Sequence, residues 1–581
     1  MPCPTAARPS AEPPTGAAPP TGVEATGARA WTGAVSSWRE ALRNHFQPPR
    51  RGSILSLLLP FAVAVGVYAN TLGYGAAWDD TRFVFQSGAS GGVSAIPSLL
   101  TRPFLDDVPP ARAPYRPVTA ASYALDWSLS DGQAAAFHTT NVVLHATVTL
   151  LVAALLLSVG APWTGALVGG VVFAVHPVHV EAVANLAGRG ELLAALFLLT
   201  AALIFRRRWR AAGRIGPGAT LLICLLYALG MGSKESAIML PALLLLLTLL
   251  PGGSRRKNDV ARLRRSWPVW GGLVLVAVGY LLLRARVLGT YTTYDVAPFI
   301  LGLPGWLRAT TAVANWGEYV RLLLWPMDLV VDYGPAVILP ASPADLRFWT
   351  GLVSGGGILA LAVALRRSLP LFTAGVAWFA LAILPVTNLF VPIAQWLAER
   401  FFYLPSVGLS LAAASLVPLL RTSRRGGLLG VAAVLWLLLL AGRTWTRNRS
   451  WQDTDTVVRT LISEHPEAFR AQWILARMLL EEGRTEEGLA ALDRAIALSP
   501  NAMELRLERA EWLLRSGHLE EARVALEALP AGHHAKREAL LARVYAQEGD
   551  TGAARLLLSG ALERFPRNTE LAALADSLGG S

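Results

Sequence analysis

The chain has 581 residues, of which 53% are hydrophobic and only 16% are charged, whereas soluble globular proteins carry about 25% charged residues. This composition predicts a polytopic membrane protein. The two cysteines, Cys3 and Cys224, lie in a tail and in an apolar run, so a disulfide framework and a zinc ribbon are both excluded.

The net charge of +12 is unevenly distributed along the chain. From Pro466 onward there are 14 basic and 18 acidic residues, so the excess of base falls on the apolar part that precedes it. Loop arginines of this kind set the orientation of membrane helices. No nucleic-acid partner is expected, because DNA or RNA binding needs a basic face on a soluble domain and the predicted soluble domain is mildly acidic.

Residues 1–50 are predicted to form a disordered N-terminal tail and cytoplasmic segment. Up to about Ala30 this stretch mixes Pro, Ala, Thr and Gly without apolar periodicity, and such a composition cannot bury enough surface to order itself. The tail lacks the basic region followed at once by a short apolar region that marks a cleaved signal peptide. The first spanning helix is therefore expected to stay in the protein.

Residues 51–445 are predicted to form a helical membrane bundle. A bilayer crossing needs about 20 apolar residues, and the candidate spans are 54–72, 139–158, 162–175, 183–205, 218–232, 237–251, 268–288, 349–365, 371–390, 402–420 and 426–442. If these eleven spans alternate in direction, the arginine clusters between them fall on one side, which is then the cytoplasm. The N-terminus is expected inside and the C-terminus outside.

The segment 307–326 is predicted to be an interfacial helix and not a span. Counting it as a crossing would move the arginines at 366–367 and 421–425 to the outer face, against the positive-inside rule. Trp325-Pro326 and Asp332-Tyr333 follow this helix and are expected to anchor it at headgroup depth. The stretches that remain outside are 73–138, 289–348, 391–401 and the chain after about Trp445.

Residues 446–581 show an internal repeat and are predicted to form an extracytoplasmic domain. Small residues recur at an offset of 34 and then again with two residues lost, at Ala476, Gly483, Gly488, at Ala510, Gly517, Ala522 and at Ala542, Gly549, Ala554. This period resembles the tetratricopeptide repeat, whose helix pairs stack into a short α-solenoid with a concave binding surface. Three repeats are predicted, with 451–466 as a partial earlier copy. An ordinary amphipathic bundle is the alternative.

Two adjacent acids, Asp79 and Asp80, lie a few residues beyond the first span in the motif Trp78-Asp79-Asp80. Crowding of like charges raises one pKa, so one carboxylate can act as a base or a metal ligand while its neighbour orients it. If a divalent cation such as Mg²⁺ or Mn²⁺ takes part, these two acids are its expected ligands. The alternative is that they cap a helix or lie solvated in a loop.

The run His176-Pro177-Val178-His179-Val180-Glu181 lies at the outer end of the third span, and Pro177 suits the first turn of the next helix. On that helix Glu181, Asn185 and Arg189 are spaced i, i+4 and i+8, and they are expected to form one polar stripe that faces a protein interior or an aqueous cavity. One alternative is an internal Glu181–Arg189 pair with capping histidines. Another is a zinc site made by His176, His179 and Glu181.

Cations also gather in the predicted outer hairpins. Ser233-Lys234-Glu235 lies between the fifth and sixth spans, Glu399-Arg400 precedes the tenth with Tyr403 close behind, and Arg116 lies in the first outer loop. Arg189, Lys234 and Arg400 are expected to converge on an anionic headgroup, because fixed cations in a dry cleft hold a phosphate strongly. The alternative for each is snorkelling to the membrane interface.

Taken in order, these motifs resemble those of the TMTC-type protein O-mannosyltransferases and their bacterial relatives, which are multispanning GT-C glycosyltransferases with C-terminal tetratricopeptide repeats. The resemblance covers the chain from about Ile54 onward, and its most specific part is His-Pro-x-His-x-Glu-Ala-Val-Ala. The matching motifs are Trp78-Asp79-Asp80, Tyr115-Arg116-Pro117, HPVHVEAVANLAGRGELL at 176–193, Ser233-Lys234-Glu235, Trp325-Pro326, Asp332-Tyr333, Glu399-Arg400 and Tyr403-Leu404-Pro405-Ser406.

The resemblance implies a reaction at the outer face of a bacterial inner membrane. A sugar, mannose in the family, would pass with inversion from a polyprenyl or dolichyl phosphate to a Ser or Thr hydroxyl of an extracytoplasmic protein recruited by the repeats. Asp79 or Asp80 would be the catalytic base, and Arg189, Lys234 and Arg400 would hold the departing phosphate. The supporting residues would be Arg116, His176, His179, Glu181, Glu235 and Tyr403.

Two other functions are compatible with a membrane bundle that carries repeats. A non-enzymatic scaffold for envelope assembly would use the bundle only as an anchor, but an anchor needs one span and gives no reason for a polar stripe. A transporter of lipid-linked sugars would place ionisable groups near the middle of several spans and show related halves. In this sequence the polar motifs gather at the outer ends of the spans.

Overall fold

The fold is helical throughout the residues that the computed structural model describes, which are 51–105, 113–212, 215–250, 259–289, 298–334, 337–393, 395–500, 502–532, 534–566 and 568–579. Every regular element within these ranges is a helix, and none is a strand. This confirms the all-α fold class. The predicted disordered tail at 1–50 lies outside the described residues.

Each predicted span overlaps a helix of the bundle. Six described helices are long and apolar enough to cross a bilayer, or seven if the bent pair Trp163–Val175 and Pro177–Val183 counts as one span, and four further apolar helices are shorter. The count of eleven crossings therefore stays a prediction. The bundle helices are α2 (Arg51–Tyr68), α5 (Ala134–Ser158), α6 (Trp163–Val175), α8 (Arg189–Ala212), α9 (Pro217–Ser233), α10 (Leu240–Leu249), α12 (Trp267–Leu288), α15 (Leu346–Leu365), α16 (Pro370–Ile383), α17 (Val407–Thr422) and α18 (Gly426–Asn448).

Glycines let helices of the bundle approach closely. Gly375 of α16 and Gly408 of α17 face each other, and a Cβ on either would collide with the carbonyl oxygen of the other. Gly351 of α15 lies in the same way against the backbone of Val313 and Ala314 in α14 (Gly305–Leu324). Close contacts of small residues are the usual packing of membrane helices, because lipid supplies no hydrophobic drive between them.

The outward faces of several bundle helices are apolar. Leu221 of α9, Leu275 of α12 and Leu428 of α18 are each more than 70% exposed. Exposed leucines over whole helix faces are unfavourable in water and favourable in lipid. The composition of these surfaces agrees with a membrane protein.

The helix α14 occupies the segment predicted to lie at the interface. It carries Arg308, Glu318 and Arg321 and is not among the described helices that are apolar enough to span a membrane, so its interfacial position stays a prediction. The prediction for two of the residues that follow α14 has to be corrected. Asp332 is 3% and Tyr333 2% exposed because other protein groups cover them, so the expectation that they contact lipid headgroups is wrong.

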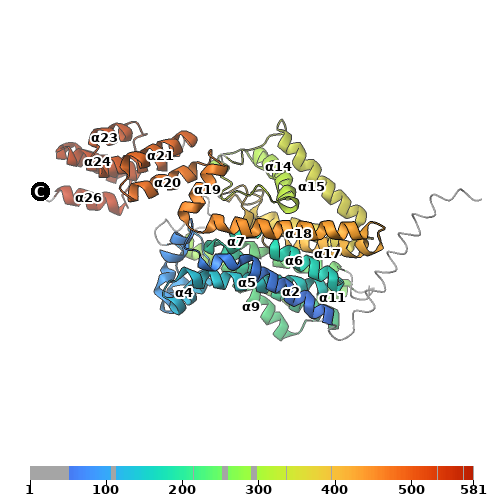
Figure 1. Ribbon diagram of the computed structural model, residues 1–581. Helices are drawn as coiled ribbons and strands as arrows, with labels where there is room; N and C mark the ends of the chain where they lie inside the picture. The colour runs from blue at the N-terminus through green and yellow to red at the C-terminus, as the bar shows by residue number, and fades with distance from the viewer. Residues whose placement is uncertain are drawn as a thin grey trace, which may run out of the picture.

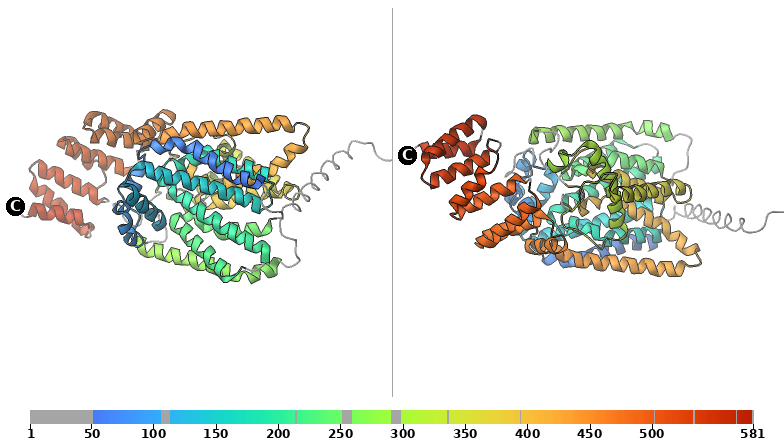
Figure 2. Two further views of the ribbon diagram at one scale, coloured as in Figure 1. Left: turned by 60° about the horizontal axis from the view of Figure 1, so that its bottom comes forward. Right: turned by 90° about the horizontal axis from the view of Figure 1, so that it is seen from above.

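The two ends of the bundle differ in their chemistry. At one end Asn448 of α18 donates to Asn70, just beyond α2, and the C-terminal helices extend from this end in both Figure 1 and Figure 2. At the other end Arg206 and Arg210 of α8 donate to the carbonyl oxygens of Leu247 and Ser158, at the ends of α10 and α5. The repeat-facing end carries the predicted functional motifs.

The first outer stretch, predicted at 73–138, folds into short helices at the repeat-facing end (Figure 1). Its core is aromatic, with Phe104, Tyr123 and Phe137 buried together. The elements are η2 (Ala69–Gly73), η3 (Thr81–Phe85), η4 (Gly88–Ala95), α3 (Ile96–Leu99) and α4 (Pro117–Ser130).

The C-terminal part is a stack of antiparallel helix pairs, as the repeat predicts. Gly483, Gly517 and Gly549 each follow the first helix of a pair with φ between 79° and 91°, a left-handed conformation that glycine adopts without strain. A final helix, α26, was not predicted from the sequence. The helices are α19 (Thr454–Glu464), α20 (Phe469–Glu481), α21 (Thr485–Leu498), α22 (Met503–Arg515), α23 (Leu519–Glu527), α24 (Ala535–Gln547), α25 (Thr551–Arg564) and α26 (Thr569–Gly579).

Candidate active site

The loop that carries the two adjacent acids is held against the start of the repeat region. The amide of Gly75 donates to the carbonyl oxygen of Gln452, and the amide of Trp78 donates to Oγ1 of Thr454, both at 3.0 Å. Trp78 has φ +56°, a conformation that residues other than glycine, and bulky ones above all, rarely adopt. Backbone strain of this kind persists only where surrounding contacts enforce it, and it is common at functional sites.

Asp80 is fully buried and braces this loop. Its carboxylate accepts hydrogen bonds from the amides of Ala77 at 3.0 Å and of Ala187 at 2.7 Å. Burial raises the pKa of Asp80 to about 7, although these backbone hydrogen bonds act to lower it. Both oxygens face the protein, so the geometry favours a bracing role for Asp80 over proton abstraction from a substrate.

Asp79 is in a different environment although it is the next residue. It is half-buried, and its carboxylate makes no hydrogen bond or ion pair with the residues that the structure describes. Burial raises the pKa of Asp79, while the nearby Arg400, Arg470 and Arg82 lower it and Asp332 raises it. A carboxylate that is partly desolvated and free of partners can accept a proton from a ligand.

The run from His176 to Arg189 is not one helix, so the prediction that its polar residues form one stripe on a helix is wrong. The chain forms η6 (Pro177–His179), α7 (Val180–Val183) and η7 (Leu186–Gly188) before α8 begins. Asn185 is extended, with φ −77° and ψ 118°, and its side chain accepts from the amide of Ala187. Gly188 folds back on the backbone of Ala182, where a Cβ would not fit. Glu181 and Arg189 therefore point to different partners.

Glu181 pairs with Arg400, which joins two of the predicted motifs. The guanidinium Nη1 of Arg400 contacts Oε1 of Glu181, and the amide of Arg400 donates to Oε2 at 2.8 Å. Nη2 of Arg400 donates to Oε1 of Gln395 at 2.7 Å. The Glu181 side chain is 2% exposed and that of Arg400 is 22% exposed. Arg400 thus keeps a face open to a ligand while its orientation is fixed.

Arg189 is fully enclosed and is not brought to the same surface. Its Nη2 forms a 2.6 Å ion pair with Asp126, and its Nε donates to Oδ1 of Asn141 at 2.8 Å. Its guanidinium also lies 4.5 Å from the ring centroid of Tyr123. The alternative of an internal Glu181–Arg189 pair is wrong, since each residue has another partner. The predicted phosphate contact of Arg189 has no support in this geometry.

Lys234 and Arg116 form two further ion pairs beside this site. Lys234 Nζ lies 3.0 Å from Glu191, and Arg116 Nη2 lies 3.0 Å from Glu235. Burial lowers the pKa of Lys234, and the neighbouring cations Arg116 and Arg400 lower it further. Arg116, Lys234 and Arg400 therefore interact electrostatically while each is paired with an acid, and their convergence on an anionic headgroup stays a prediction.

The predicted histidines and Tyr403 are buried and engaged with the protein. Nδ1 of His176 accepts from the amide of Val178, and its Nε2 bonds the carbonyl oxygen of Leu323. His179 bonds Ser406 Oγ at 2.8 Å through Nε2, and its ring packs against that of Tyr403. Among the described residues no group of three His, Cys, Asp or Glu could hold a metal ion. The zinc alternative is therefore wrong.

The donor set at the two acids does not fit the predicted Mg²⁺ or Mn²⁺ either. Only Asp79 offers a free carboxylate, because Asp80 uses both oxygens on backbone amides, and hard divalent cations take several oxygen ligands.

Several residues of the site were missed from sequence. Glu191 lies inside the motif at 176–193 that carries the resemblance, so it could have been predicted as a site residue from that motif. Gln395 and Arg470 carry no such signal, because each lies in an unremarkable local sequence and reaches the site only through the fold.

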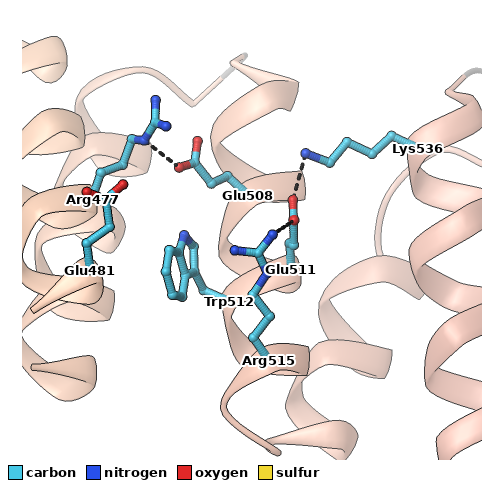
Figure 3. Close-up of a pocket in the computed structure, with 7 residues that line it drawn as sticks. All are labelled: Arg477, Glu481, Glu508, Glu511, Trp512, Arg515 and Lys536. Atoms are coloured by element: carbon cyan, nitrogen blue, oxygen red, sulfur yellow. Dashed lines mark hydrogen bonds and ion pairs between the residues drawn. The ribbon is translucent and has the colours of Figure 1, made fainter. Parts of the chain in front are cut away.

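A second candidate site lies on the repeats and is shown in Figure 3. The cavity, of about 220 Å³, is lined by the first helices of the three repeats, with Trp512 of α22 in its middle. Arg477 pairs with Glu508, and Glu511 lies between Lys536 and Arg515. Glu481 makes no ion pair with the residues that the structure describes. This surface offers one aromatic face and one free acid.

The comparisons with known proteins agree with the resemblance seen in the motifs. The protein O-mannosyl-transferase F38B6.6 of Caenorhabditis elegans is 26% identical over 78% of this chain and 64% of its own length. Tmtc1 of Drosophila melanogaster is 26% identical over 76% of this chain and 61% of its own length, and human TMTC4 is 26% identical over 64% and 56%. The resemblance to the TMTC-type protein O-mannosyltransferases is confirmed.

The remaining comparisons concern the repeats and solved structures. The tetratricopeptide repeat family model matches residues 479–544, which confirms the repeat predicted from the spacing of small residues. No solved structure matches the chain. The chain spans less than two thirds of the length of these relatives, which are named protein O-mannosyl-transferases.

Proposed function

We propose that this protein is a GT-C-type membrane glycosyltransferase that moves a sugar from a polyprenyl-phosphate donor to Ser or Thr hydroxyls of proteins outside the cytoplasm. The observation that supports this most is the half-buried, unpartnered carboxylate of Asp79 beside Arg400, at the end of the bundle where the repeats stand. Mannose is the proposed sugar, because the curated relatives are named O-mannosyl-transferases.

Asp79 serves as the catalytic base in this proposal. The acceptor hydroxyl oxygen attacks the anomeric carbon from the face opposite the phosphate, and its proton passes to the Asp79 carboxylate. The new bond joins the acceptor oxygen to the anomeric carbon. The bond between that carbon and the phosphate oxygen breaks, and the polyprenyl phosphate leaves with the electron pair. The configuration at the anomeric carbon inverts.

The departing phosphate needs fixed positive charge. Arg400 keeps 22% of its side chain exposed, Arg116 20% and Lys234 11%, whereas Arg189 is fully enclosed. We therefore assign phosphate binding to Arg400 and Lys234 with Arg116 beside them, and give Arg189 the role of holding α4 and α5 to the start of α8. Cations held in place by partner carboxylates stabilise developing negative charge without reorganising.

The repeats would recruit the acceptor through the cavity of Figure 3. Solenoids of this kind bind extended peptides along their concave surface. Arg515 already lies over the Trp512 ring, but Glu481 has a carboxylate without an ion pair among the described residues, which suits a peptide with a Lys or Arg side chain because opposite charges attract.

The proposed membrane orientation follows from the two ends of the bundle. The arginine-rich end lies on the cytoplasmic side and the repeat-facing end on the outer side, which in a bacterium is the periplasmic side of the inner membrane. A reporter fused after Ser581 tests this orientation, and cytoplasmic activity of the reporter would contradict it.

The decisive experiment replaces Asp79 and measures transfer by the purified full-length protein. Polyprenyl-phosphate mannose and a Ser/Thr acceptor peptide serve as substrates, and mass spectrometry of the peptide reports the product. Asp79→Asn should abolish turnover, because an amide cannot accept the proton, and should leave folding intact because the Asp79 carboxylate makes no hydrogen bond or ion pair with the residues that the structure describes. Asp328→Asn is the matched control, since its side chain is 88% exposed. Unchanged transfer by Asp79→Asn would contradict the catalytic role of Asp79, whereas absence of transfer by the wild type would favour the scaffold function.

A further inference from the structure

A chain of contacts joins the repeats to the candidate active site. Arg470 lies in the first turn of α20, and its Nη1 is 3.4 Å from Oδ1 of Asp332. The same oxygen accepts a 2.9 Å hydrogen bond from Nε2 of Gln395. Gln395 in turn accepts from Nη2 of Arg400 at 2.7 Å. A residue of the repeat region is thus connected to the cation that pairs with Glu181.

Arg470 also acts on Asp79 through space. The side chain of Asp332 is 3% exposed and that of Arg470 is 31% exposed, so this pair lies partly out of water, where charges interact more strongly. Arg470 lowers the pKa of Asp79 and Asp332 raises it. The other charged groups that face Asp79 are Arg400, Arg82 and the adjacent Asp80.

Contacts with residues after α18 also fix the backbone of the loop that carries Asp79 and Asp80. Thr454 at the start of α19 accepts from the amide of Trp78, and Gln452 accepts from the amide of Gly75. The loop conformation and the electrostatic environment of Asp79 therefore depend on residues that follow α18.

We propose that Arg470 is a positioning residue of the active site, contributed by the repeat region. It holds Asp332 and thereby the Gln395–Arg400 pair, and it completes the charges around Asp79. The inference rests on the proposed glycosyl transfer and deepens it. The repeats then form part of the catalytic apparatus in addition to recruiting the acceptor.

The test uses the full-length protein, polyprenyl-phosphate mannose and a Ser/Thr peptide too short to reach the cavity on the repeats. Arg470→Gln should lower kcat by at least about tenfold, because small displacements of reacting groups cost that much or more, with little change in the KM for the peptide. It should also move the acidic limb of the pH–rate profile to higher pH, since a cation that lowers the pKa of Asp79 is lost. Arg470→Lys should restore the position of that limb.

Asp332→Asn should shift the acidic limb of the pH–rate profile in the opposite direction. It removes a negative charge that raises the pKa of Asp79, so the acidic limb should move to lower pH, and a purely structural role would not produce opposite shifts. Arg459→Gln on α19 is the control, because its ion pair with Asp455 is exposed, and it should match the wild type.

The outcomes separate the inference from the function on which it rests. Wild-type transfer together with an unchanged kcat and pH profile in Arg470→Gln overturns the inference alone. Absence of transfer by the wild type overturns the proposed function. If Arg470→Gln fails to fold, Asp332→Asn decides through its pH profile, and a profile identical to that of the wild type overturns the inference.

Discussion

The ion pair between Arg189 and Asp126 gives the sharpest test of how the bundle is held together. The Arg189 side chain is 0% and the Asp126 side chain 10% exposed, with 2.6 Å between Nη2 and Oδ2. Arg189 also donates to Asn141 and to the carbonyl oxygen of Phe137 at 3.0 Å. Arg189→Met leaves these acceptors without their donor inside the protein.

The expected cost follows from the burial of the pair. Removing one partner of a buried ion pair costs about 3–5 kcal/mol, because the other charge stays buried and unpaired. A loss of this size corresponds to a fall in Tm of a few °C, because the unfolding entropy grows with chain length at about 2.1 cal/mol/K per residue. Arg189→Met combined with Asp126→Leu removes both charges, so the double variant should be more stable than Arg189→Met alone.

The assay is the thermal unfolding of the detergent-solubilised protein, followed in parallel with binding of a polyprenyl phosphate. If Arg189 ligates the donor phosphate, as the sequence suggested, Arg189→Met would keep the wild-type Tm and lose donor binding, and the double variant would not recover stability. That result would refute the bracing role argued from the structure.

Three further predictions concern the contact between α16 and α17, the buried acid Glu399 and the cavity on the repeats. Gly408→Leu should lower the Tm of the solubilised protein because the side chain would collide with Gly375, whereas Gly356→Leu, which faces open space, should not. Burial raises the pKa of Glu399 to about 8 from an ordinary value of 4.5; stability should therefore fall as pH rises from 4.5 to 8, and Glu399→Gln should flatten that dependence in thermal unfolding across this range. Trp512→Ala should raise the KM for an acceptor protein without changing kcat, and an unchanged KM would remove the cavity from the acceptor site.

The positions of most helices along the chain could be predicted from sequence because they depend on local patterns. Runs of apolar residues marked the helices of the bundle, and the 34-residue offset of Gly483 and Gly517 marked the ends of the repeat helices. The break between Glu181 and Arg189 could not be predicted in the same way. A polar i, i+4, i+8 pattern is typical of a helix face, and only the tertiary contacts of Asn185 and Gly188 turn the chain there.

The candidate site was predictable in its residue types and not in its pairings. Lys234 and Arg400 were predicted as cations of the site, but each is held by an acid far away in the sequence, Glu191 and Glu181. Ion-pair partners separated by tens or hundreds of residues leave no spacing pattern, so a single sequence cannot assign them.

The difference between Asp79 and Asp80 shows how the fold assigns distinct roles to adjacent acids. Helical geometry at η3 turns one carboxylate toward the amides of Ala77 and Ala187, and it leaves the other beside Arg400. The first acid fixes the loop and thereby the position of the second. A carboxylate that is held in place by its backbone and has no other partner can accept a proton from a substrate, and in this loop the hydrogen bonds of Asp80 hold the backbone while Asp79 keeps its carboxylate unpaired.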